Sequence, residues 1–173
     1  QNGIKYAKDG RLITFSVKIN EPETSYGYIK TKEVINESED VCLKLEKFVE
    51  KPSQVEAIKY TQDLKYRWNS GIYLFRASTI ISELQRYSPE TIELCTKSLK
   101  ESSVDLDFLR LDSNSYNKCS NNSIEYAVIE KTTKGAVLAI SNNWRDMGTW
   151  RNQWKNMKKT NTTIGIMEFV DLV

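Results

Sequence analysis

The sequence predicts an α/β domain with a mixed, mainly parallel sheet, and three observations support this fold class. Runs rich in β-branched residues alternate with segments of helical spacing. Residues 71–75 are continuously apolar, which is typical of a strand buried on both faces. The 173 residues, 39% of them hydrophobic, suffice for one domain with a sizeable core. Such alternation favours a sheet covered on both sides.

Three strands are expected in the first part of the chain. Residues 11–19 follow a turn signal and are rich in β-branched residues. Residues 26–30 form a second extended segment, in which Gly27 between two tyrosines indicates close approach of the backbone to another group, such as a ligand. After a polar loop at 34–40, extended structure resumes over 41–49.

Helices are expected next, around the apolar strand. Ser53 can cap a helix that continues through Leu64, because its hydroxyl can accept a hydrogen bond from the first turn. Ser78 starts an amphipathic helix with apolar residues at helical spacing, and Pro89 begins another. This order of strand, helix, strand and helix is the basis of the α/β prediction.

The last part of the chain is less regular. Residues 105–119 are polar and mixed, and their expected apolar anchors are Phe108, Leu109 and Leu111. Ser123 can cap a helix over 123–130. Residues 135–140 then predict a final strand.

The composition excludes several classes of function. Lys and Arg total 25 against 23 acidic residues, and a net charge of +2 gives no field that would attract nucleic acid or a membrane surface. The chain has no histidine, so His-dependent catalysis and His-ligated metals are excluded within it, and any metal must have oxygen ligands. No segment approaches the roughly 20 apolar residues that span a bilayer. We expect no nucleic-acid or membrane partner, while a homo-oligomer stays open.

The cysteines and the first residues bear on location. Cys42, Cys95 and Cys119 are odd in number and widely spaced, which argues against a disulfide framework or a thiolate zinc site. A reducing cytoplasm fits this best, and the opening residues contain no apolar signal-peptide core. The chain starts without Met, directly before a turn signal, so we expect it to be cut from a longer protein.

Polar residues beside the expected strands form four candidate clusters, because a polar group there costs free energy unless it is paired. In the first, Glu50 can accept hydrogen bonds from sugar hydroxyls and Lys51 can hold a phosphate oxygen. A surface ion pair in a turn is the alternative. In the second, Asn69, Ser70 and Gly71 offer an amide for hydroxyl groups and a backbone open to close approach. A plain turn beside a core tryptophan is the alternative there.

The other two clusters are acidic. Glu125 and Glu130 lie near Lys131 on the expected helix at 123–130, where solvated helix charges are the alternative. Asp146 follows the last expected strand, and a carboxylate at the carboxyl end of a strand can be half of a magnesium site. It can equally cap a short helix.

Five segments in order carry a family resemblance. They are YGYI at 26–29, FVEKP at 48–52, WNSGIYLFRA at 68–77, SIEYAVIEKT at 123–132 and WRDMGTW at 144–150. Over roughly residues 10–155 the chain resembles mannose-1-phosphate guanylyltransferases. These nucleotidyltransferases make GDP-mannose and include bifunctional enzymes with a C-terminal mannose-6-phosphate isomerase domain.

The resemblance implies a Rossmann-like fold, mannose 1-phosphate and GTP as substrates, and Mg²⁺ as cofactor. The sugar phosphate attacks the α-phosphorus of GTP, and pyrophosphate leaves. The candidate residues that the resemblance implies fall into two groups. Those for sugar binding are Gly27, Glu50, Asn69, Ser70, Gly71 and Glu125. Lys51 corresponds to the residue that neutralises the sugar phosphate and Asp146 to a magnesium ligand, so these two are the candidate catalytic residues.

Parts of the family pattern do not occur in these 173 residues. The Gly-rich loop that cradles the triphosphate and the second magnesium-binding Asp are expected upstream of Gln1. We therefore expect a partial domain that lacks the nucleotide-binding half and is inactive alone. Residues 1–155 are its sugar-phosphate part, and 156–173 are a divergent tail or the start of a next segment. The alternatives are a nucleotidyltransferase for another sugar 1-phosphate and a non-catalytic sensing subunit of the same fold.

Overall fold

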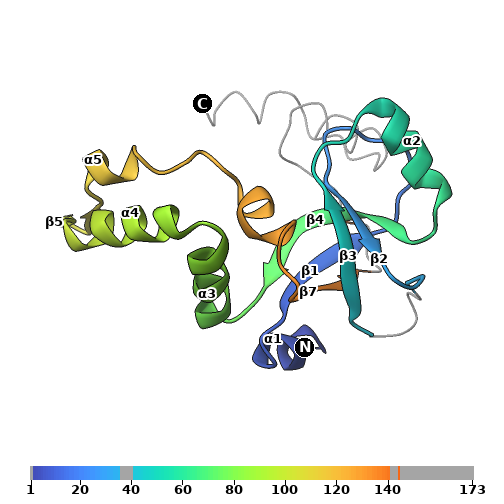
Figure 1. Ribbon diagram of the computed structural model, residues 1–173, viewed down its shortest axis with the longest axis horizontal. Helices are drawn as coiled ribbons and strands as arrows, with labels where there is room; N and C mark the ends of the chain where they lie inside the picture. Colours follow the sequence, from blue (N-terminus) through green and yellow to red (C-terminus); the bar gives the residue numbers. More distant parts are fainter. Residues whose placement is uncertain (1, 36–40, 141–143, 145–173) are drawn as a thin grey trace, which may run out of the picture. The chain divides into compact units, whose positions relative to one another are not determined.

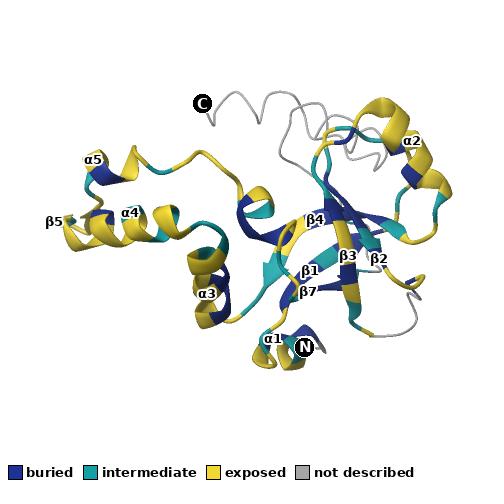
Figure 2. Ribbon diagram, in the orientation of Figure 1, coloured by how far each residue is buried: buried dark blue, intermediate teal, exposed yellow. Residues whose placement is uncertain are grey.

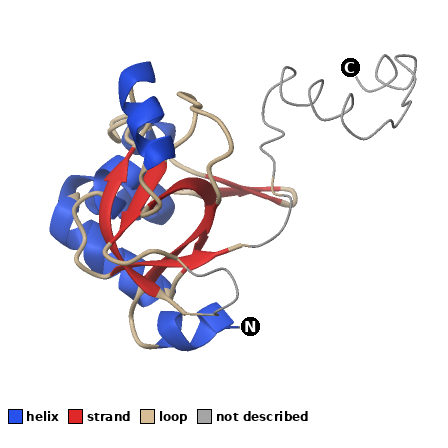
Figure 3. Ribbon diagram, turned by 90° about the vertical axis from the view of Figure 1, so that its right-hand side faces the viewer, coloured by secondary structure: helices blue, strands red, loops and turns tan. Residues whose placement is uncertain are grey.

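A computed structural model of the protein describes residues 2–35, 41–140 and 144. Contacts divide the chain into units at 1–141 and 142–173, and the described helices and strands all belong to the first unit. Five strands of this unit close into a barrel in the order β1, β4, β2, β3 and β7 (Figure 1, Figure 3). In that order their bounds are Leu12–Val17, Tyr66–Leu74, Tyr28–Thr31, Leu43–Val49 and Gly135–Ala139. The five main strands expected from sequence are thus confirmed.

The sheet is mixed, but the prediction that it is mainly parallel is wrong. Within the described barrel, β1 and β7 form the parallel pair, whereas the other four neighbouring pairs are antiparallel. Helix α2 (Gln54–Gln62) does connect two strands that run in the same direction, β3 and β4. Strand β2 lies between them and runs the opposite way. Alternation along the sequence does not specify which strands become neighbours.

The core lies inside the barrel and continues to η1, a π-helix turn at Glu125–Ile129. Along β1, Leu12 belongs to this core while Ile13 packs on the opposite face, beside helix α1 (Asn2–Lys8). This is the period-two alternation of a strand. Figure 2 shows the buried colour concentrated on the strands. Thr14, next on the inward face, is buried although it is polar.

Helix α2 confirms the cap expected at Ser53. The Ser53 side chain accepts a hydrogen bond from the Glu56 amide at 3.3 Å, and the Glu56 carboxylate accepts one from the Ser53 amide at 3.0 Å. This capping box is worth about 1 kcal/mol. Tyr60 of α2 stacks on Tyr66 of β4 with ring centroids 4.1 Å apart. The helix start is thereby fixed directly after the turn that carries Glu50 and Lys51.

Strand β4 differs from its prediction in burial. Its fully buried part is the stretch 67–70, whereas Ile72 is 48% exposed. The register with β1 shifts, because Ser16 pairs with Asn69 while Thr14 pairs with Tyr73. Gly71 has φ +73° at this irregularity, which is a β-bulge. Gly71 and Ile72 are exposed at the bulge, whereas Tyr73 and Phe75 pack partly buried against the core and Leu74 packs on the opposite face, so the apolar run is only partly buried.

The chain between β4 and β7 is mostly helical. Before η1, its elements are α3 (Ala77–Tyr87), α4 (Pro89–Lys100), β5 (Ser103–Asp105), β6 (Phe108–Arg110) and α5 (Ser113–Tyr116). The expected anchors Phe108, Leu109 and Leu111 are exposed, because β5 and β6 form a two-stranded hairpin. Ser123 does not cap η1 with its side chain. None of the described helices is long and apolar enough to cross a membrane.

An ion pair between a buried carboxylate and a partly exposed lysine ties the helical segment to the barrel. Glu83 of α3 is 2% exposed, and its carboxylate lies 2.9 Å from Lys134 Nζ. The Thr132 hydroxyl donates a hydrogen bond of 2.5 Å to the same carboxylate. These contacts hold the pKa of Glu83 below its usual value although burial opposes them. Glu83 therefore links α3 to the segment that enters β7.

Candidate functional site

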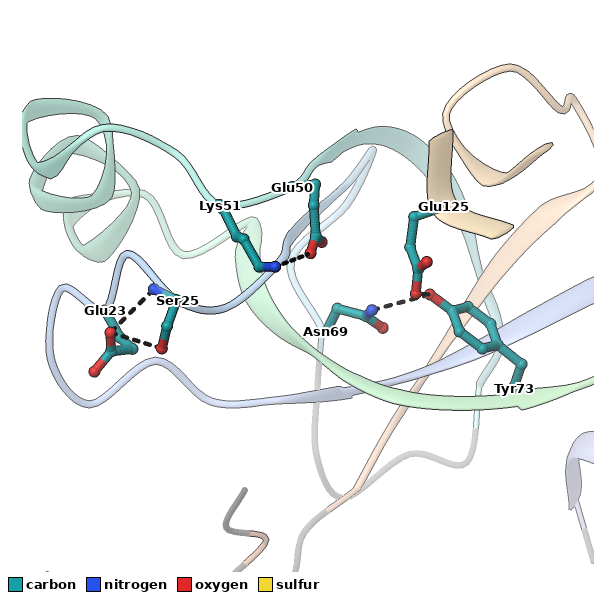
Figure 4. Close-up of polar contacts among 7 residues, drawn as sticks. All are labelled: Glu23, Ser25, Glu50, Lys51, Asn69, Tyr73 and Glu125. Atoms are coloured by element: carbon teal, nitrogen blue, oxygen red, sulfur yellow. Dashed lines mark hydrogen bonds and ion pairs between the residues drawn. The ribbon is translucent and has the colours of Figure 1, made fainter. Parts of the chain in front are cut away.

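Four segments that are far apart in sequence bring polar residues together at one end of the barrel (Figure 4). Gly27 immediately precedes β2, Glu50 follows β3, Asn69 lies in β4 and Glu125 begins η1. The register pairs Tyr28 with both Val49 and Trp68, so one step further Gly27 lies between Glu50 and Asn69. The backbone N–H of Asn69 donates a 2.7 Å hydrogen bond to the backbone carbonyl of Gly27.

Gly27 is close to three side chains. A Cβ atom built on it would lie 2.7 Å from Glu50 Oε2, 3.1 Å from Phe48 Cζ and 3.4 Å from Asn69 Cβ. The missing side chain leaves room for the Glu50 carboxylate over the backbone. The close approach predicted at Gly27 is confirmed, and the group that approaches it within this chain is Glu50.

Asn69 is the centre of a hydrogen-bond chain. The buried Thr14 hydroxyl donates to Asn69 Oδ1 at 2.7 Å. Asn69 Nδ2 donates to the Tyr73 hydroxyl at 3.0 Å, and that hydroxyl donates to Glu125 Oε1 at 2.8 Å. The side-chain amide of Asn69 is thus oriented, and one of its N–H groups has no partner among the described residues and can donate to a ligand.

Sequence reasoning did not single out Thr14 and Tyr73 as polar parts of this site. Thr14 supports a strand as a β-branched residue, and Tyr73 counts as apolar within the run 71–75. The available signal was that Asn69 and Tyr73 are four residues apart on one strand, on the same face by alternation. The bulge that brings them together has no clear mark in the sequence besides Gly71.

The electrostatics of the site are dominated by carboxylates. Burial raises the pKa of Glu50 above its usual value; the Glu125 and Glu130 carboxylates add to the rise and Lys51 opposes it. Burial, together with the Glu125 carboxylate, also raises the pKa of Tyr73, so its hydroxyl keeps its proton and remains a donor. Carboxylates beside an oriented amide offer several acceptors and a donor, which suits a ligand rich in hydroxyl groups.

Lys51 lies beside these carboxylates and reaches toward solvent. Its Nζ is 3.8 Å from Glu50 Oε1, and its side chain is 65% exposed. Its backbone has φ +46°, in the left-handed region that residues other than glycine rarely adopt. In the described part of the chain, the Lys51 ammonium group thus places a cation next to Glu50 for an anionic part of a ligand.

The remaining predicted residues have other places. Ser70 Oγ accepts a hydrogen bond from the Ile72 amide at 3.2 Å, and Gly71 supplies the positive φ, so both belong to the bulge of β4. Asp146 lies outside the described residues. Within the described part of the chain, no group of three or more His, Cys, Asp or Glu side chains is arranged to hold a metal ion.

Comparisons with known proteins agree on one family. The sequence matches the nucleotidyl transferase family over residues 1–163. A mannose-1-phosphate guanylyltransferase of Escherichia coli (strain K12) is 37% identical over 156 residues, which are 90% of this chain and 33% of that protein. The chain thus spans about a third of the length of the curated relatives that it matches.

Two solved structures share the mixed α/β fold. A mannose-6-phosphate isomerase from Helicobacter pylori aligns with a TM-score of 0.73 and 27% identity, covering 83% of this chain and 55% of that one. A protein described as a mannose-1-phosphate geranyltransferase, from Thermus thermophilus, aligns with a TM-score of 0.69 and 30% identity, covering 85% and 40%.

Proposed function

The chain belongs to the nucleotidyl transferase family, and from this premise we propose that it supplies the sugar-phosphate site of an enzyme that transfers GMP from GTP to mannose 1-phosphate. The products are GDP-mannose and pyrophosphate. The choice of sugar and nucleotide follows the name of the Escherichia coli relative.

One observation carries the proposal: Gly27, Glu50, Asn69 and Glu125 converge from four segments of the chain. If these residues only formed structural ion pairs in separate turns, no glycine would be needed between Glu50 and Asn69. Nor would the Asn69 side-chain amide need to be held by the buried Thr14 hydroxyl. The arrangement supports a built site for hydroxyl groups, with Lys51 at its exposed side for a phosphate.

Each residue then has a physical role. Glu50 accepts hydrogen bonds from sugar hydroxyls, and the free N–H of Asn69 donates one. Lys51 screens the negative charge of the sugar phosphate, because two phosphates must approach in line against their mutual repulsion. Positioning and charge screening supply most of the catalysis of phosphoryl transfer, so the chain needs no nucleophilic side chain.

The nucleotide and metal parts of the proposal rest on sequence. Asp146 is the proposed magnesium ligand in this chain, and Mg²⁺, when bound, neutralises phosphate charge. We further propose that the phosphates of GTP are held by residues beyond this sequence, since no Gly-rich phosphate loop occurs among its 173 residues.

The full-length protein that carries this chain provides the test. Pyrophosphate release is measured with mannose 1-phosphate or glucose 1-phosphate, each with GTP and with dTTP. We expect the highest kcat/KM for mannose 1-phosphate with GTP. Faster turnover with glucose 1-phosphate or dTTP would replace this substrate assignment with the alternative of another sugar nucleotide, and no turnover with any pair would favour a sensing subunit.

Two variants test the residues. Glu50→Ala is expected to raise the KM for the sugar phosphate, whereas Glu46→Ala on the exposed face of β3 is the matched control without effect. Asp146→Asn is expected to lower kcat by orders of magnitude with an unchanged circular dichroism spectrum. Near-normal turnover of Asp146→Asn would remove this residue from the metal site.

A further inference from the structure

We propose that Tyr73 is a positioning residue that couples Asn69 to Glu125 and so sets the affinity for the sugar phosphate. Its hydroxyl accepts a hydrogen bond from Asn69 Nδ2 at 3.0 Å and donates one to Glu125 Oε1 at 2.8 Å. The inference rests on the proposed function for the identity of the ligand. The coupling itself rests on the geometry alone.

The bulge of β4 makes this contact. On a regular strand, residues four apart are separated by about 13 Å, because each residue advances the strand by about 3.3 Å. Here the four-residue step from Asn69 to Tyr73 lies opposite a two-residue step of β1, from Ser16 to Thr14. The shortened path lets the Tyr73 hydroxyl reach back to the side chain of Asn69 (Figure 4).

The three hydrogen bonds are all donated in the same direction, from Thr14 towards Glu125. Thr14 donates to Asn69 Oδ1, which turns the NH₂ group of Asn69 toward Tyr73. The Tyr73 oxygen accepts from that group, so its own proton goes to Glu125. Since burial and Glu125 raise the pKa of Tyr73, this proton is retained over the physiological range. Because every donor and acceptor in this series of hydrogen bonds is fixed, each side chain is held in one orientation.

The coupling determines what remains for a ligand. Asn69 keeps one N–H, and no described residue bonds to Glu125 Oε2. Together with the Glu50 carboxylate, these groups form an acceptor-rich site with an oriented donor. Without the Tyr73 hydroxyl, the Asn69 amide loses a partner and Glu125 can rotate away. Tyr73 therefore acts through its two neighbours.

Tyr73→Phe in the full-length protein removes the hydroxyl and keeps the ring. We expect the KM for mannose 1-phosphate to rise about tenfold, which corresponds to about 1.4 kcal/mol and to the loss of a hydrogen bond to a charged group. The KM for GTP is expected to stay unchanged. Tyr116→Phe on α5 is the matched control, because Tyr116 is 55% exposed.

A double-mutant cycle separates positioning from a general loss of structure. When Glu125→Ala is already present, Tyr73→Phe is expected to raise the KM less than it does in the parent protein, since one of the two groups through which it acts is gone. Fully additive effects of the two substitutions would overturn the proposal. An unchanged KM in Tyr73→Phe, with a parent that turns over mannose 1-phosphate, would overturn it as well.

A ligand-free measurement keeps this proposal distinct from the proposed function. A parent protein without turnover contradicts the proposed function and says nothing against the coupling. In that case the NMR resonances of the Asn69 side-chain amide decide whether the coupling exists. Tyr73→Phe is expected to shift them and Tyr116→Phe to leave them in place. Resonances that are identical in Tyr73→Phe and the parent would refute the coupling whatever the ligand is.

Discussion

The carboxylate of Glu50 lies directly over the backbone of Gly27, so close that a Cβ atom on Gly27 would be 2.7 Å from Glu50 Oε2. The two residues face each other where β2 and β3 meet, one step beyond the pair Tyr28 and Val49. A glycine is therefore required at position 27 because the Glu50 carboxylate occupies the place of a side chain. The backbone conformation of Gly27 would itself accept alanine.

Gly27→Ala should separate binding from folding. The atom that the new methyl meets first is the end of a flexible side chain, so the carboxylate moves and the fold survives. We expect the KM for mannose 1-phosphate to rise about tenfold or more, on the scale of lost hydrogen bonds to a charged group. Steady-state kinetics and a thermal melt of the same preparation check both statements.

Gly135→Ala is the matched control. Its Cβ would also lie 2.7 Å from a side chain, but that side chain is Leu45, packed inside the barrel. Overpacking a core costs about 1–3 kcal/mol, so this variant should melt at a lower temperature. The KM of its folded fraction should equal that of the parent. A KM as high as that of Gly27→Ala would mean that any strain in the barrel disturbs the site.

Lys51→Gly tests why a lysine occupies a left-handed backbone position. Such a conformation costs about 1–2 kcal/mol for a residue with a side chain, and glycine relieves it at the expense of a more flexible unfolded chain. We expect the free energy of unfolding in urea to stay within about 1 kcal/mol of the parent or to rise. The KM for the sugar phosphate should increase, because the ammonium group is lost.

Leu106→Gly isolates the backbone part of that change. Leu106 also has a positive φ, +54°, and is 88% exposed in the hairpin of β5 and β6. Its replacement should move the unfolding free energy in the same direction as Lys51→Gly and leave the KM alone. Equal KM values for Lys51→Gly and the parent would contradict the phosphate role of Lys51.

Local features of this fold could be predicted from sequence, because they depend on neighbouring residues. The cap at Ser53 follows from its position three residues before Glu56, β1 follows from its β-branched content, and β7 follows from its short apolar run after a glycine. Gly27 and Glu50 stood out because a glycine in an expected extended segment and a charged pair before a proline are unusual in themselves. These are the residues that the structure brings together.

Features that depend on distant partners were missed for a physical reason. Periodicity gives the face of a residue and not its neighbouring strand, so the antiparallel contacts of β4 with β1 and β2 could not be read from alternation. Tyr73 has an apolar ring and a polar end, and only the three-dimensional contact with Glu125 shows which one matters.

Cys95 and Cys119 should form a disulfide under oxidising conditions. The three cysteines are free thiols, but these two have Sγ atoms 3.9 Å apart. With hydrogen peroxide, two thiols give one disulfide and two waters, and the chain loses two hydrogen atoms. Burial and Cys95 raise the pKa of the Cys119 thiol, so the reaction should be faster above neutral pH.

Tryptic peptide mapping by mass spectrometry detects this link. Cys95→Ser should abolish it, and Cys42→Ser should not, because Cys42 is partly buried with a pKa raised to about 11. A dominant link from Cys42 to either of the others would contradict the arrangement of α4 and the segment after α5.

The pH dependence of stability should reveal the cost of burying Glu50. Its folded-state pKa is raised above the usual 4.5, first by burial and then by Glu125, so the folded protein binds this proton more tightly than the unfolded chain does. The resulting stabilisation is fully present below about pH 4.5 and is lost as the pH rises through the raised pKa. Glu50→Gln removes the charge and should therefore be more stable than the parent at pH 7, with a difference that vanishes near pH 4.

Urea unfolding of both proteins across this range, with Glu46→Gln on exposed β3 as control, checks the sign. The pair with Lys51 opposes the effect, but the 65% exposed lysine makes its contribution small. A parent more stable than Glu50→Gln at pH 7 would show that this pair outweighs burial. The affinity of the parent for mannose 1-phosphate should rise over the same pH interval, since the ionised carboxylate is a stronger, acceptor-only group, whereas the protonated form carries an O–H donor and accepts more weakly. The charge that weakens the fold would then be the charge that binds the sugar.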